Sequence, residues 1–269
     1  MMNILVCVKQ VPDTTEIKID PVKHTLIREG VPSIVNPFDA CALEMAVRLK
    51  EKEGGKVTVA TMGPAQAKNA LKECLSVGAD QAFLVTDRAF GGSDTLATSY
   101  ILSRAVKAIE AKTGETFDVI FCGKQAIDGD TAQVGPEMAE HMDLPHVTLA
   151  TGLELEGRKM RVVRDTDEGH DIVEVELPAL VTVTKTPFDP RYPSIKSKMA
   201  ANRAVITEIT NSDPDMVCDP ECLGLHGSPT KVKKTFTPNQ SKDGVIITGE
   251  AGADAAMKLA AMLNDAKII

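Results

Sequence analysis

The chain of 269 residues contains no tryptophan, two tyrosines and seven phenylalanines. Proteins that hold single-stranded nucleic acid stack bases on aromatic rings, so this scarcity argues against such a platform. Apolar packing must come instead from Val, Ile, Leu, Ala and Met, within a hydrophobic content of 43%. That content is enough for one large core and a smaller appendage.

Positive charge is also in short supply, with 30 Lys and Arg against 38 Asp and Glu and a formal net charge of −8. Nucleic acid and anionic membrane surfaces are therefore not expected partners. Long hydrophobic runs are missing: the apolar run in residues 1–9 is too short for a signal peptide, and no stretch approaches a membrane span. We expect a cytoplasmic protein.

The six cysteines show no metal or disulfide pattern. Four stand singly in apolar stretches, where buried thiols behave as small hydrophobic groups. Cys218 and Cys222 form a lone C-x-x-x-C without further ligands nearby. Neither a metal site nor a disulfide is predicted, and the cysteines fit a reducing compartment.

Short apolar runs alternate with amphipathic stretches, as in a doubly wound α/β fold with a mostly parallel sheet and helices on both faces. Strands are predicted at Asn3–Lys9, Lys56–Thr61, Ala82–Thr86, Val119–Cys122 and Leu180–Thr184. Helices are predicted at Asp39–Glu53, Ala65–Val77 and Asp94–Lys112. Leu153–Val163 and Ile172–Leu177 alternate polar and apolar residues, which predicts a β-hairpin that extends the sheet.

The pattern changes after residue 185. Residues 211–241 lack clear periodicity, and Asp254–Ala266 is again amphipathic. So long a loop region is uncommon inside one compact domain. We expect residues 1–185 to form the α/β domain and residues 186–269 to form an arm against another polypeptide. The alternative is a disordered linker whose final helix docks on its own domain.

The most informative segment follows the predicted strand Val119–Cys122. It reads G-K-Q-A-I-D-G-D-T-A-Q-V-G-P, and a helical pattern comes next. Ligands of open α/β sheets collect at the carboxyl ends of strands, where the first amides of the following helix suit a phosphate group. The helix could begin at Thr131, after an Asp130–Gln133 capping box, or at Pro136, after Gly135. The segment is neither a nicotinamide Rossmann fingerprint nor a Walker A loop, so an ordinary capped turn is the alternative.

Six motifs, in this order along the chain, resemble the β subunit of electron transfer flavoproteins over nearly its full length. They are V-C-V-K-Q-V-P-D (Val6–Asp13), N-P-F-D (Asn36–Asp39), M-G-P-A-Q (Met62–Gln66), G-A-D (Gly78–Asp80), G-K-Q-A-I-D (Gly123–Asp128) and D-P-R-Y (Asp189–Tyr192).

The resemblance implies a partner α subunit and an adenine-nucleotide pocket made by the first strand, the N-P-F segment, the loop after the second strand and the strand-to-helix turn that follows Cys122. The residues that it assigns to the pocket are Cys7, Val8, Lys9, Asn36, Pro37, Phe38, Asp39, Met62, Gly63, Gly123, Lys124, Gln125, Asp128, Gly129, Asp130, Thr131, Ala132, Gln133, Val134 and Gly135. The nucleotide is AMP in one branch of the family and FAD in another. Gly129 has no Cβ and so fits the close approach of a pyrophosphate, and Asp39 is expected near the flavin ring.

The segment D-G-D-T-A-Q-V-G-P resembles the FAD-containing branch, which takes hydride from NADH and divides the two electrons. One electron then goes to ferredoxin or flavodoxin, and the other goes through the α subunit to an acyl-CoA dehydrogenase or similar enzyme. Gly91, Gly92 and Thr95 lie in a second strand-to-helix loop that we expect to be mobile and to receive NADH. A plain capped turn is the alternative there.

The D-P-R-Y segment falls in the partner-recognition loop of the family, where Ile195 would present an aliphatic anchor among basic residues. A solvated basic loop is the alternative. No catalytic residue is predicted, because the flavin supplies the chemistry. Two further functions stay open: a non-bifurcating carrier with AMP, and an ATP-hydrolysing protein that uses Lys124, Asp128 and Asp130.

Overall fold

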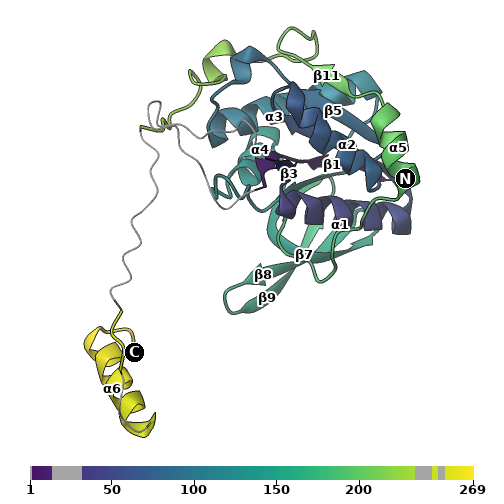
Figure 1. The fold of residues 1–269 in the computed structure, drawn as a ribbon. Coiled ribbons are helices and arrows are strands. Elements are labelled where there is room, and N and C mark those ends of the chain that lie inside the picture. Colours follow the sequence, from purple (N-terminus) through teal and green to yellow (C-terminus); the bar gives the residue numbers. More distant parts are fainter. Residues whose placement is uncertain (1, 14–31, 234–243, 248–251) are drawn as a thin grey trace.

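The structure is a computed structural model and describes residues 2–13, 32–233, 244–247 and 252–269. Its main sheet has nine strands in the order β11-β5-β4-β1-β6-β10-β7-β8-β9 (Figure 1). These strands are β1 (Met2–Cys7), β4 (Gly55–Met62), β5 (Gln81–Val85), β6 (Val119–Gly123), β7 (His146–Glu156), β8 (Lys159–Thr166), β9 (Gly169–Glu176), β10 (Ala179–Val183) and β11 (Thr207–Ile209).

The seven strands from β11 to β7 run parallel, and β8 and β9 continue the sheet in antiparallel fashion. All five strands predicted from apolar runs are confirmed. The predicted hairpin is confirmed in part, because residues 160–163 in β8 pair antiparallel with residues 172–175 in β9. The stretch Leu153–Val163 is not one strand, however, since it turns back on itself at residues 157–158. It contributes to both β7 and β8, while Ile172–Leu177 lies in and just beyond β9. A small second sheet pairs β2 (Gln10–Pro12) with β3 (Ser33–Val35).

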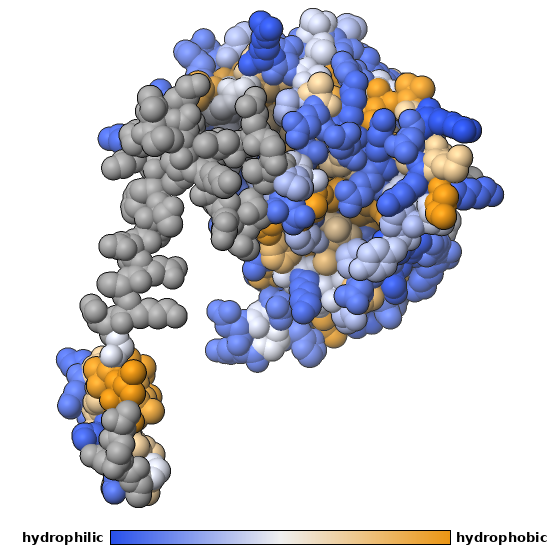
Figure 2. Space-filling model, in the orientation of Figure 1, coloured by the Kyte–Doolittle hydropathy of each residue, from blue (hydrophilic) through white to orange (hydrophobic). Residues whose placement is uncertain are grey.

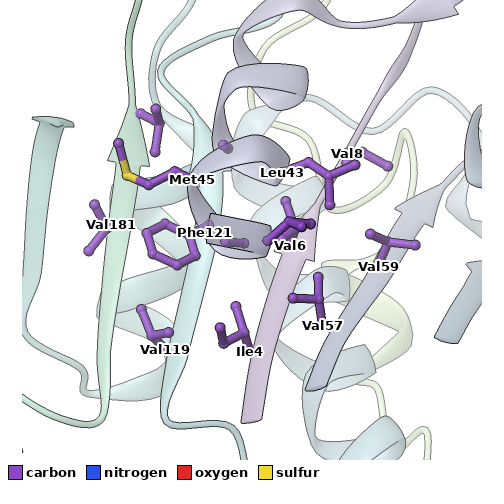
Figure 3. Packing of buried hydrophobic residues seen from close by; sticks show 14 of the residues in the cluster. Ile4, Val6, Val8, Leu43, Met45, Val57, Val59, Val119, Phe121 and Val181 are labelled. Atoms are coloured by element: carbon purple, nitrogen blue, oxygen red, sulfur yellow. The ribbon is translucent and has the colours of Figure 1, made fainter. Parts of the chain in front are cut away.

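Helices cover both faces of the sheet, as predicted. Helix α1 (Pro37–Glu53) and helix α2 (Lys68–Ser76) pack on one face, and α3 (Thr95–Thr113) and α4 (Val134–Met142) pack on the other. Short 3-10 turns precede two of them, at Ala65–Ala67 and Arg88–Phe90. Figure 3 shows Leu43 and Met45 of α1 directed at a layer of valines, isoleucine and Phe121 from the central strands. Continuous apolar strands are expected where helices cover both faces.

The segment after residue 185 contributes to the α/β body. Helix α5 (Ile195–Arg203) packs against α2, and β11 adds an edge strand beside β5. A third 3-10 turn, Pro220–Cys222, follows. The main sheet therefore continues past the expected domain boundary, and the arm proper is the part that leads to α6 (Gly252–Asp265). In Figure 1 α6 lies apart from the sheet, and none of its residues is buried.

Candidate functional site

A cleft of about 890 Å³ opens at the carboxyl ends of β1, β4 and β5. Buried apolar side chains, among them Val85 and Phe90, form part of its wall. Charged side chains of Lys9, Arg88 and Asp128 also line it. Apolar surface with a few polar groups is the usual lining of a cofactor site.

Asp39 lies between the ends of β1 and β6, the position in the sheet where the strand order reverses. Its carboxylate accepts hydrogen bonds from the Lys9 amide, at 2.7 Å, and from the Gly123 amide, at 3.0 Å. A Cβ on Gly123 would overlap the Asp39 Oδ1 atom, which explains the glycine. Asp39 is buried and is not among the residues that line the cleft. It therefore contacts the backbone at the strand ends and not the space inside the cleft.

Burial raises the pKa of Asp39 to about 7 from its ordinary value of 3.8. Hydrogen bonds from Asn36 and from the Lys9 and Gly123 amides lower this pKa but do not cancel the cost of desolvating the charge. The carboxyl group can therefore change its charge near neutral pH. A charge change there would act on two strand ends at once.

Asn36 does not cap α1 with its side chain, although it occupies the cap position. Its Nδ2 donates to the Gln125 carbonyl at 2.8 Å, and its Oδ1 accepts from the Ile127 amide at 3.1 Å. Asn36 is completely buried. The N-P-F-D motif thus fixes the loop that follows β6 as well as the start of α1.

The loop after β6 uses its first amides internally and leaves its last ones open. Gly129 and Asp130 donate to the Ala126 carbonyl, whereas the amides of residues 131–135 donate to no residue that the structure describes. Asp130 and Ala132 have left-handed backbones, with φ of 51° and 54°. Ala132 is followed by Gln133 in a right-handed helical conformation, and a pair of this kind can make successive N–H groups converge on an anion.

Both predicted starts of α4 are wrong, because the helix begins at Val134. Asp130 cannot cap a helix that begins at Thr131, because its left-handed backbone departs from cap geometry. Its carboxylate instead accepts a hydrogen bond from Gln125 Nε2 at 2.6 Å. Pro136 is accommodated inside the first turn, where an amide would have no partner in any case.

The loop after β5 is held on both sides. Asp87 accepts hydrogen bonds from the Ala89 and Asn211 amides, and Asp94 caps α3 through the Ala97 amide. Gly92 has φ of 76° and packs directly on Leu225, so its glycine has a structural reason. This contact fixes a loop that the sequence predicts to be mobile. Thr95 faces α4, with its Oγ1 3.2 Å from a Glu137 oxygen.

The structure brings part of the predicted set together. Of the predicted residues, those that line the cleft are Lys9, Met62, Gly63, Gly91, Gly92 and Asp128. An ion pair of 2.7 Å between Lys9 Nζ and Asp128 Oδ1 connects the end of β1 to the loop after β6. Cys7 and Val8 are buried at the end of β1 and do not line the cleft. Pro37 is exposed, and Lys124 Nζ lies 5.5 Å from the centre of the Phe38 ring.

Sequence reasoning missed other cleft residues, notably Ser33, Arg88, Phe90 and Thr210. Arg88 carried a usable signal, because a cation beside a predicted phosphate loop offers charge compensation. Ser33 and Thr210 carried none, since they reach the cleft through distant parts of the chain.

The residues proposed for ATP hydrolysis have separate partners. Lys124 lies over Phe38, Asp128 pairs with Lys9, and Asp130 binds Gln125. Among the residues that the structure describes, no group of three or more His, Cys, Asp or Glu side chains is placed to hold a metal ion. No described helix is long and apolar enough to cross a membrane.

Comparisons with known proteins agree on one family. Residues 23–214 match the model of the electron transfer flavoprotein domain. An electron transfer flavoprotein subunit beta of Thermoanaerobacterium thermosaccharolyticum is 52% identical over 268 residues, 100% of each chain. Subunit CarD of the caffeyl-CoA reductase-Etf complex of Acetobacterium woodii is 47% identical over 100% of each chain. Protein FixA of Azorhizobium caulinodans is 44% identical over 88% of this chain and 85% of its own.

Proposed function

The chain belongs to the β-subunit family of electron transfer flavoproteins, and we propose that its cleft binds FAD for NADH-dependent electron bifurcation. As a β subunit it pairs with an α subunit and acts in electron transfer. In the proposed reaction, electrons from NADH divide between ferredoxin or flavodoxin and an acyl-CoA dehydrogenase-type enzyme. The name of the caffeyl-CoA reductase-Etf relative supports a partner that acts on a CoA thioester.

The size of the cleft is the observation that carries this proposal. At about 890 Å³ it lies near the upper end of the range for cofactor sites, roughly 300–1,000 Å³. A mononucleotide would leave much of this space to water, whereas a dinucleotide would occupy more of it.

The loop after β6 reaches the cleft through Asp128, and its later amides offer donors that suit a diphosphate. The amides of residues 131–135 have no described partner, and Lys9 and Arg88 add positive charge. A Cβ on Gly129 would meet no atom within 4 Å, so this glycine is not required by packing against described residues. A ligand that approaches the backbone closely would account for it.

Bound FAD would supply hydride acceptance from NADH and the onward delivery of single electrons. The protein would orient the cofactor through backbone amides that are fixed before binding, which avoids an ordering cost. Buried Val85 and Phe90 would exclude water from the ring system. Asp39 would hold the Lys9 and Gly123 amides in place, and its charge would bias the electrostatic field at the strand ends.

The D-P-R-Y loop supports a role in partner binding, because it is rigidly attached. Arg191 forms ion pairs with Glu44 and Glu51 on α1, with nitrogen–oxygen distances of 2.7 and 2.6 Å. These contacts fix the backbone just before Tyr192 and Ile195, whose exposed fractions are 95% and 82%. Apolar side chains on a fixed loop lose little entropy on binding, so we propose this loop as the dehydrogenase contact.

We propose that α6 is the part of the arm that packs on the α subunit. Its exposed apolar residues include Met257, Leu259 and Met262. Figure 2 shows a hydrophobic patch on this helix. A helix with such a face is stabilised by burial against another surface. Most of the stretch 234–251, which precedes it, lies outside the described residues.

Anaerobic assay of the purified αβ complex tests the function. NADH should reduce ferredoxin only when the acyl-CoA dehydrogenase and its enoyl-CoA substrate are present, because the two electron transfers are obligatorily coupled. Ferredoxin reduction without the second acceptor would contradict bifurcation. A complex that accepts electrons from the dehydrogenase but never oxidises NADH would be the non-bifurcating carrier with AMP.

A further inference from the structure

The segment that follows β11 runs along the outside of the loop after β5. The Thr86 amide donates to the Ile209 carbonyl at 2.9 Å, and the Asn211 amide donates to Asp87 Oδ2 at 3.1 Å. Further on, the Asp219 amide donates to the Tyr100 hydroxyl at 2.8 Å. The cleft wall is therefore supported from behind by residues more than a hundred positions later in the chain.

Asp94 and Ser228 form the centre of this support. The Asp94 amide donates to Ser228 Oγ at 2.9 Å, and Ser228 Oγ donates to the Gly224 carbonyl at 2.6 Å. One Asp94 oxygen caps α3, and the other accepts from the Thr230 amide at 2.9 Å. Ser228 is 3% exposed, so both of its hydrogen bonds are shielded from water.

Close packing accompanies these hydrogen bonds. A Cβ on Gly92 would come within 2.6 Å of Leu225 Cγ, and a Cβ on Gly224 would overlap the Ala89 carbonyl oxygen. Both glycines have positive φ, 76° for Gly92 and 54° for Gly224. The two backbones are thus in direct contact, and movement of one displaces the other.

Residues 88 and 90–93, on the other side of this contact, line the cleft. We propose that residues 219–230 are a brace that holds this wall in its ligand-binding form, with Ser228 and Asp94 as positioning residues for the nucleotide. The inference rests on the proposed nucleotide site. A wall that is ordered before binding saves the entropy of ordering it, so loss of the brace should weaken affinity. The chemistry concerned is the adenylate moiety that AMP and FAD share.

The test compares Ser228→Ala with Ser99→Ala in the complete αβ complex. Ser99 is also fully buried, but its hydroxyl binds only the Leu96 carbonyl of its own helix. After removal of bound nucleotide, AMP and FAD are titrated separately by calorimetry, and thermal midpoints are recorded. We expect Ser228→Ala to bind at least one of them roughly tenfold more weakly than Ser99→Ala does, with similar midpoints. Affinity equal to that of Ser99→Ala would overturn the inference.

Leu225→Ala provides a second route if Ser228→Ala does not fold. Leu225 is 63% exposed, so its truncation removes the contact with Gly92 without opening the core. A several-fold loss of nucleotide affinity supports the brace, and an unchanged affinity refutes it. Wild-type complex that binds neither AMP nor FAD would instead refute the proposed nucleotide site, so the two failures are distinguishable.

Discussion

The loops after β5 and β6 resemble each other in sequence but differ in how their polar groups are used. Both are glycine- and aspartate-containing links from a buried strand to a helix. In the loop after β5, Asp87, Gly92 and Asp94 serve contacts with the chain's own later residues. In the loop after β6, the amides of residues 131–135 have no described partner, and a Cβ on Gly129 would meet no described atom within 4 Å.

We infer that the loop after β5 mainly supports the fold, whereas the loop after β6 is available to bind a ligand. Polar groups that are satisfied within the protein contribute to stability, whereas donors left open at a strand end are available to a ligand. Substitutions at the exposed residues 129–133 should therefore change ligand affinity and leave stability nearly unaffected. Asp39 and Lys9 connect the start of this loop to β1. Substitution of Asp39 should therefore affect both stability and ligand affinity, whereas substitution of Lys9 should affect mainly affinity.

The largest effect is expected at Asp39, which satisfies two amides at strand ends. Asp39→Ala leaves two partly buried amide donors without a partner, so the free energy of unfolding should fall by about 3 kcal/mol. Asp118→Ala is the control, because Asp118 accepts the Asn3 amide at the opposite edge of the sheet. We expect nucleotide affinity to fall only in Asp39→Ala. Equal unfolding midpoints in urea for the two variants would contradict the assigned role.

The raised pKa of Asp39 predicts a pH dependence of stability. The unfolded carboxyl ionises near its ordinary pKa of 3.8, while the folded one stays protonated until about 7. Between these values the folded state binds more protons, so the contribution of Asp39 falls as pH rises, by at most about 1.4 kcal/mol per pH unit. Urea unfolding of wild type and Asp39→Asn from pH 4 to 8 isolates this contribution. If the stability of wild type instead rises relative to that of Asp39→Asn as the pH rises, the hydrogen bonds to Asp39, and not its burial, dominate its pKa.

Gly129→Ala should weaken nucleotide binding roughly tenfold without a change in stability. The added methyl group meets no atom of the described residues within 4 Å, so loss of binding would come from its contact with the ligand. Gly152→Ala in β7 is the matched control, because a Cβ there also has nothing within 4 Å. Fluorescence titration with FAD and thermal unfolding provide the measurements. If the two variants bind alike, the open amides are not a phosphate site.

The smallest effect is expected at the Lys9–Asp128 ion pair. The Lys9 side chain is 49% exposed, and pairs of this kind contribute less than about 1 kcal/mol to stability. Lys9→Gln should therefore leave the thermal midpoint almost unchanged but weaken binding of a diphosphate by loss of one positive charge. Lys56→Gln, which breaks an exposed pair with Glu115 away from the cleft, is the control. A large fall in the thermal midpoint of Lys9→Gln, but not of Lys56→Gln, would show that the Lys9–Asp128 pair stabilises the fold.

Periodicity predicted the parts of the fold that depend on local hydrophobicity. The five strands and three helices named from the sequence are confirmed, because covered parallel strands need continuous apolar runs. The turn at residues 157–158 was missed, since the polar and apolar alternation continues across it. Strand β11 is three residues long, which is too short for a periodic signal.

The site was predictable only as far as strand ends and motifs could indicate it. The left-handed backbones of Asp130 and Ala132 have no clear sequence signature, because such conformations are usual for glycine and uncommon for alanine. The contact between Asp94 and Ser228 spans 134 positions and leaves no mark on local pattern. Asn36 occupies a helix cap position, but its side chain binds the loop after β6 through the Gln125 carbonyl and the Ile127 amide, which local sequence does not indicate.

Extraction of the nucleotides from the native αβ complex tests the central claim most directly. Denaturation of the purified complex followed by chromatography of the supernatant should yield two FAD for each αβ pair, one of them from the cleft of this subunit. One FAD together with one AMP would contradict the account, because the cleft would then hold only the adenylate part and could not accept hydride from NADH.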